Sequence, residues 1–169
     1  AMIMHYWQYP VKPTGQVNYY WYAGRKRLKI NLDTVTYNYS LMPDSALRGS
    51  GYSQHYWWNN AQIHEVSKFN YHIGVTNEME YDVDGSGVAT RSGITRNSFI
   101  NNFKYDADSI FIMDRTVYPY VNNSSTPNSR DTLWVNTLAN EIKRKRPVLY
   151  CGFDESSAGV HAGHAWVCE

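Results

Sequence analysis

The strongest constraint on the fold is a helix-forming segment followed by two short apolar runs near the C-terminal end. A helix is expected to begin at Thr132, and in it Trp134, Leu138 and Ile142 fall on one apolar stripe. The run KRKR crowds its last turn, where positive charge interacts favourably with the helix dipole, and Pro147 ends it. The runs VLYCGF and HAWVCE follow. The pattern predicts a helix packed on two buried strands of a hairpin, which gives an antiparallel sheet in the C-terminal half.

Upstream of this block, helical and extended patterns alternate with segments rich in glycine, proline and tyrosine. We expect helices over 1–8, over 57–74 with Gly74 as C-cap, and over 93–103 with Ser92 as N-cap. Extended structure is expected over 30–43, 75–81 and 109–113, and loops or irregular structure over 9–27, 44–55, 82–90 and 118–131. Helices followed by C-terminal strands indicate an α+β fold.

Composition excludes several classes of function. The chain has 169 residues, 43% of them hydrophobic and 18% charged, as expected for one folded domain. Its net charge of +1 gives no general electrostatic reason to bind nucleic acid or an anionic membrane. It contains no apolar run of about 18 residues, so no transmembrane span is expected. The 15 tyrosines, the many asparagines and the few lysines hint at an exported bacterial protein.

Two cysteines and two histidines near the C-terminus raise the question of a metal site. Cys151, His161, His164 and Cys168 have the ligand types of tetrahedral zinc, but not the usual spacing of paired ligands. In addition, the two histidines are three apart on an extended segment and would point to opposite faces. We therefore expect no metal and no cofactor. The cysteines could form a disulfide across the hairpin, but two small buried apolar side chains are the stronger expectation.

The glycine-containing segment DVDGSGVAT does not fit two common ligand-binding loops. The GSG between Asp84 and Val88 is short and lacks the lysine of a phosphate-binding loop. Asp82 and Asp84 precede a glycine, but the remaining oxygen ligands of a calcium loop are missing.

His164 has the best placement for chemistry. Its neighbours Gly163 and Ala165 allow a backbone or a substrate to approach, and the start of a strand would hold its ring. Such a histidine suits a general base that activates a nucleophile. On its own, however, a lone histidine is more often a structural residue held by hydrogen bonds.

Several segments, in order along nearly the whole chain, resemble the streptopain-like cysteine peptidases. RPVLYCGFDESSAGVHAGHAWVCE, preceded by a helix with W…L…E, is similar to the family's histidine region, P-V-x-Y-x-G followed by G-H-A-[FW]-V. AMIMHYWQYP resembles the end of the family's nucleophile helix. TVTYNYSLMP and FNYHIGVTNEMEYDVDGSGVAT resemble two segments between them. The resemblance implies a papain-like fold and a peptidase that cleaves peptide bonds.

The resemblance also implies roles for particular residues. His164 would be the catalytic base, and its partner cysteine would lie a few residues ahead of the position that matches Ala1. Cys151 and Cys168 match ordinary core positions of the family, so neither replaces that cysteine. The oxyanion-hole glutamine would lie further upstream and the N-W-G-W-G segment beyond Glu169. Residues 1–169 would thus be a single papain-like catalytic domain truncated at both ends. Substrate would contact Gly163, Ala165, Ser86, Gly87 and Val88.

The parent protein would be a secreted or cell-surface bacterial endopeptidase acting on protein or peptide substrates. An N-terminal inhibitory prosegment is expected. His161 departs from a glycine-like family position, and either modulates the cleft or is only a loop residue. Two alternatives stay open at this point. One is a catalytically inactive homologue that acts as a binding or inhibitory module. The other is a metal-stabilised or aromatic-rich carbohydrate-binding module.

Overall fold

The structure is a computed structural model, and it describes eight ranges of the chain. These are 1–44, 47–48, 55–56, 58–83, 85–88, 93–113, 129–155 and 161–169. The chain divides into two compact units. The first comprises Ile3–Ile110 with Ala1, and the second comprises Phe111–Glu169 with Met2.

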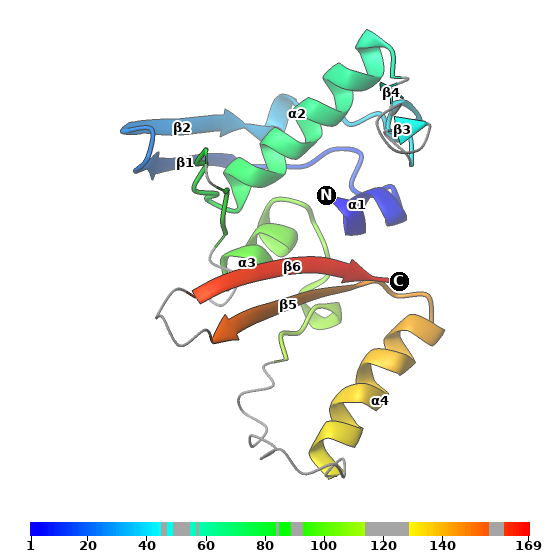
Figure 1. The fold of residues 1–169 in the computed structure, drawn as a ribbon. Coiled ribbons are helices and arrows are strands. Elements are labelled where there is room, and N and C mark those ends of the chain that lie inside the picture. The colour runs from blue at the N-terminus through cyan, green and yellow to red at the C-terminus, as the bar shows by residue number, and fades with distance from the viewer. Residues whose placement is uncertain are drawn as a thin grey trace. The chain divides into compact units, whose positions relative to one another are not determined.

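The first unit opens with α1 (Met2–Trp7), followed by an antiparallel hairpin of β1 (Gln16–Trp21) and β2 (Lys26–Asn31) (Figure 1). The loop predicted over 9–27 is therefore wrong in its second half. The strand forms because alternate residues of β1 face the unit. Tyr19 is buried and donates from its hydroxyl to the Met79 carbonyl at 2.6 Å, and the Trp21 indole nitrogen donates to the Tyr81 carbonyl at 2.8 Å. These contacts are long-range, and local sequence does not indicate them.

Extended structure over 30–43 is also only partly correct. The short helical turns η1 (Leu32–Thr34) and η2 (Tyr39–Leu41) interrupt it. Each turn begins after an asparagine, Asn31 or Asn38, whose side chain accepts a hydrogen bond from a backbone N–H two residues on. The alternating aromatic residues nevertheless enter the core, whose buried members are Met4, Tyr37, Tyr39, Met42, Phe69 and Phe103.

The long helix α2 (Asn60–Thr76) contacts both strands of the first hairpin (Figure 1). Asn59 caps it reciprocally with Gln62, which explains its sharp start. Gly74 is not the expected C-cap, because the helix continues to Thr76. A Cβ at Gly74 would lie 2.2 Å from the Tyr81 hydroxyl oxygen, so this glycine provides space for that ring.

The other described segments of the first unit are short or irregular. The expected strand over 75–81 is reduced to one antiparallel bridge, Glu80 with Gly87. The helix α3 (Ile94–Asn101) begins after Gly93, which is left-handed at φ 77° and makes no side-chain cap; the predicted cap Ser92 lies outside the described residues. No strand forms over 109–113; instead η5 (Ala107–Ser109) precedes an irregular segment. The two-residue strands β3 (Leu47–Arg48) and β4 (His55–Tyr56) pair within the segment expected to be irregular.

The second unit contains the block that the sequence predicts best. Its helix α4 (Ser129–Lys143) starts three residues before Thr132, and β5 (Val148–Glu155) pairs antiparallel with β6 (His161–Cys168) (Figure 1). The prediction that both strands are buried is wrong, because residues 163–166 are exposed. Two strands and one helix cannot bury both faces of a sheet. Trp134 and Leu138 are half-buried, and Ile142 is 38% exposed.

The mixed helices and small antiparallel sheets confirm the α+β class. In the described ranges, no helix combines the length and the apolar character needed to cross a membrane.

Candidate active site

His164 lies in the middle of β6, opposite Gly152 of β5, and its side chain is exposed. Side chains alternate along a strand, so His164 and Trp166 share a face of the hairpin. Their rings stack, with centroids 5.9 Å apart and planes at 27°. This stacking orients the ring of His164.

The stack continues across the hairpin as a row of aromatic rings. Tyr150 pairs with Trp166 in the strand register, and their ring centroids are 4.8 Å apart. Trp134 of α4 lies 6.0 Å from Tyr150 in a T-shaped arrangement. We call Trp134, Tyr150, Trp166 and His164 the aromatic row. Sequence reasoning identified Trp134 and His164 but missed the roles of Tyr150 and Trp166. The sequence contains the information needed to find this pair, because a hairpin register that pairs Val148 with Cys168 also pairs Tyr150 with Trp166.

Gly163 and Ala165 flank His164 along the strand, as predicted. They pair with Phe153 and Cys151 of β5, and both are exposed. By strand alternation, Ala165 projects from the face opposite to His164, so any contact of these residues with substrate would involve mainly their backbone.

Ser86, Gly87 and Val88 belong to the first unit. Gly87 exchanges two backbone hydrogen bonds with Glu80, at 2.9 and 3.0 Å. Ser86 and Gly87 are exposed, and Val88 is half-buried. The preceding Gly85 has φ 145°, a conformation that favours glycine. The segment is thus a short, mostly exposed stretch tied to Glu80 by one bridge, and its role in substrate binding stays a prediction.

Cys151 and Cys168 are both free and half-buried, not fully buried as expected. Cys151 pairs with Ala165, whereas Cys168 pairs with Val148, three positions away. An odd separation places the two cysteines on opposite faces of the hairpin, so they do not form the disulfide that was considered. Among the described residues, no group of three or more His, Cys, Asp and Glu side chains is arranged to hold a metal ion. His161 is placed in β6, but its side chain lies outside the description.

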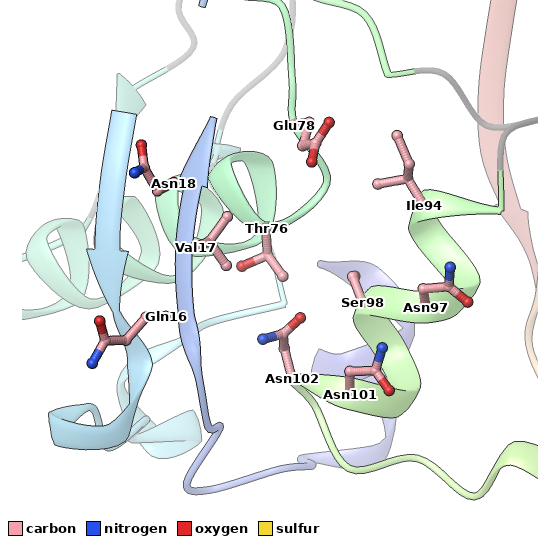
Figure 2. Close-up of a pocket in the computed structure, with 10 residues that line it drawn as sticks. All are labelled: Gln16, Val17, Asn18, Thr76, Glu78, Ile94, Asn97, Ser98, Asn101 and Asn102. Carbon is pink, nitrogen blue, oxygen red and sulfur yellow. The ribbon is translucent and has the colours of Figure 1, made fainter. Parts of the chain in front are cut away.

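A separate pocket of about 360 Å³ lies in the first unit, between β1 and α3 (Figure 2). Its walls are mostly amide and hydroxyl side chains with one carboxylate: Gln16, Val17, Asn18, Thr76, Glu78, Ile94, Asn97, Ser98, Asn101 and Asn102. None of the predicted site residues lines it.

The buried carboxylate of Glu65 is a structural group. It accepts hydrogen bonds from the Asn38 backbone at 2.9 Å and from the Lys68 ammonium at 2.7 Å. Burial alone would raise its pKa, but these hydrogen bonds outweigh burial and hold the pKa below its ordinary value. Glu65 therefore stays ionised while it ties α2 to the segment before η2, and it is not a candidate acid.

Comparison with known proteins identifies the family. The model of the peptidase C10 family matches residues 1–169, the whole chain. The chain belongs to the peptidase C10 family. This confirms the resemblance drawn from the sequence and places the chain among cysteine peptidases.

Two solved structures are similar to this member of the family. The active wild-type interpain A cysteine protease of Prevotella intermedia superposes with a TM-score of 0.73 at 25% identity, over 98% of this chain and 60% of that chain. A prointerpain A fragment from the same organism, with a cysteine-to-alanine substitution, gives a TM-score of 0.68 at 21% identity, over 98% of this chain and 45% of that chain. The first confirms the papain-like α+β fold. The chain thus spans about 60% of the length of that protease. No match was found among curated proteins.

Proposed function

We propose that the parent protein is a secreted bacterial cysteine endopeptidase in which His164 is the general base and acid of a Cys–His pair. Membership of the peptidase C10 family supports the class of chemistry. The observation that carries the assignment is the setting of His164 in β6. Its exposed ring stands between two residues with minimal side chains, so a thiol and an orienting partner can approach it.

Residues 1–169 would form the interior of one papain-like catalytic domain. The family match to the whole chain and the structural match over 98% of it support this organisation for both units. The nucleophilic cysteine would be supplied by another part of the parent. Cys151 and Cys168 do not suit that role, because both are half-buried in the ladder of the hairpin and match ordinary core positions.

The chemistry follows from a thiolate–imidazolium pair. Protonated His164 would stabilise the cysteine as a thiolate, which attacks the peptide carbonyl. Backbone and amide donors would stabilise the oxyanion, and His164 would then give its proton to the leaving amine as the C–N bond breaks. With the imidazole now neutral, His164 would take a proton from water, and the resulting attack hydrolyses the thioester and releases the second product.

An extended peptide is the substrate that this proposal requires. Ser86, Gly87 and Val88 of the first unit, and Gly163 and Ala165 of the second, would contact the peptide. Their mostly small side chains allow a peptide main chain to approach. An N-terminal prosegment would inhibit the enzyme.

The test compares single histidine variants of the activated full-length parent on fluorescein-labelled casein. His164→Ala should lose on the order of 10³-fold or more in kcat/KM, because one group makes the thiolate and protonates the leaving amine. His64→Ala is the matched control, since His64 is exposed on α2 and has no proposed role. His161→Ala should change the rate by about tenfold or less.

Iodoacetamide alkylation of the cysteine gives an independent readout. Its rate near neutral pH should collapse toward that of a free thiol in His164→Ala, because the ion pair is gone. A parent that neither cleaves casein nor reacts rapidly would be the inactive homologue. Normal turnover in His164→Ala would show that the wrong histidine has been assigned.

A further inference from the structure

Trp166 is placed so that its indole covers the strand position opposite His164. That position is Gly152, and a Cβ built there would lie 3.2 Å from the Cη2 atom and 3.5 Å from the Cζ3 atom of Trp166. The indole therefore extends from its own place in the register, opposite Tyr150, toward the neighbouring pair of His164 and Gly152. Space for this extension exists because residue 152 has no side chain.

We infer that Trp166 is a positioning residue for His164, and that Gly152 makes this arrangement possible. The inference rests on the proposed function of His164. An exposed imidazole on a strand has several rotamers, and only some of them direct a ring nitrogen toward a partner thiol. Stacking at 5.9 Å and 27° selects among them without using either nitrogen. Tyr150 also contacts the indole, with ring centroids 4.8 Å apart.

The stack restricts the ring of His164 to those rotamers in which it contacts the indole. Aromatic pairs of this kind change an equilibrium by roughly 2- to 10-fold. We therefore expect loss of the indole to lower kcat by about 3- to 10-fold while KM changes little, since substrate binding does not require the ring's orientation.

A purely structural role for Trp166 would give a different pattern. It would lower the thermal stability of the parent without altering the environment of the His164 ring. The direct readout is the NMR signal of the His164 Hε1 proton, which the nearby indole ring current shifts. The protein is isotope-labelled only at its histidines, and the signal of His164 is identified as the one that is missing from the spectrum of His164→Ala.

The experiment uses the activated full-length parent and fluorescein-labelled casein. Trp166→Leu should move the His164 Hε1 signal and lower kcat by about 3- to 10-fold, and Trp166→Phe should restore most of both because a phenyl ring still stacks. Gly152→Val keeps the indole but takes its space, so it should reproduce the effect of Trp166→Leu; Gly152→Ala should have a smaller effect. Leu149→Ala is the control, since Leu149 pairs with Val167 on the opposite face and is 39% exposed.

The outcomes separate the inference from the proposed function. If His164→Ala retains turnover, the proposed function fails and this inference fails with it. If His164→Ala is inactive but Trp166→Leu keeps wild-type kcat and an unmoved His164 signal, only the positioning role is overturned. Should Trp166→Leu fail to fold, Trp166→Phe and Gly152→Val decide by the same two measurements.

Discussion

In each of the two longer hairpins, β1–β2 and β5–β6, the ring of a tryptophan lies close to a glycine, but the environment of the ring differs. In the first, a Cβ at Gly24 would come within 2.1 Å of the Trp21 ring. That ring is fixed by its hydrogen bond to the Tyr81 carbonyl, and Lys26 lies 5.2 Å from its centroid. In the second, Trp166 is 41% exposed and stacks on an exposed histidine. The tryptophan–glycine contact thus lies at the turn of the first hairpin, whereas in the second hairpin the tryptophan also stacks on His164.

The comparison suggests a division of roles between the units. In the first unit, Tyr19, Tyr37 and Tyr39 are buried and serve stability. In each of them burial raises the pKa above the ordinary tyrosine value, and it brings the pKa of Tyr19 to about 12. In the second unit, the members of the aromatic row are half-buried or exposed, and the row includes His164, to which the proposed chemistry is assigned.

The largest expected effect tests this division by truncating one aromatic side chain in each unit. Phe69→Ala should cost about 3–5 kcal/mol, because Phe69 is 3% exposed and packs on Tyr37 at 4.9 Å. Trp134→Ala should cost only about 1–2 kcal/mol, since Trp134 is half-buried. The loss would be larger if this ring were fully buried, as the sequence predicts. Urea titrations of both variants measure the difference, and equal losses would contradict the division.

The second prediction adds one methyl group beneath each tryptophan. Gly24→Ala should destabilise the protein by about 1–3 kcal/mol, because the Trp21 ring has to leave a position fixed by its hydrogen bond. Gly152→Ala should cost less than about 1 kcal/mol, since the exposed Trp166 ring needs to move only slightly. Thermal unfolding of the two variants gives the ranking. A larger loss for Gly152→Ala would show that Trp166 is the more rigid ring.

The smallest effect compares the carboxylates of two ion pairs. Glu65 has a lowered pKa, so its contribution is present above the unfolded value of about 4.3 and is lost as pH falls through the folded pKa. Glu65→Gln should therefore cost about 1 kcal/mol at pH 7 and less at pH 3.

The matched variant in the second unit is Glu141→Gln. Hydrogen bonds from Arg146, at 2.6 and 2.5 Å, lower the pKa of Glu141 in the same direction. Arg146 is exposed, however, and solvent screens the pair, so this variant should match the wild type within the error of a denaturant titration. Urea titrations at pH 7 and pH 3 test both variants. A pH-independent loss in Glu65→Gln would show that packing, and not charge, is responsible.

Elements held by their own residues could be predicted from the sequence, and elements held by distant partners could not. Helix α4 and the β5–β6 hairpin follow from the stripe through Trp134 and from Pro147, both local signals. The β1–β2 hairpin was missed because it depends on hydrogen bonds from Tyr19 and Trp21 to residues 60 positions away. The same limit applies to the candidate site. His164 has a local signature, whereas its contact with Trp166 depends on a glycine in the facing strand.

The glycine at position 152 has a consequence for how related sequences vary. A side chain there would lie against the Trp166 ring, so a larger residue at position 152 requires that ring to move or to be replaced by a smaller side chain. Among homologues, residues larger than glycine at the first position should accompany smaller residues at the second. The residues at the two positions should therefore vary together, although the positions lie 14 apart in the sequence.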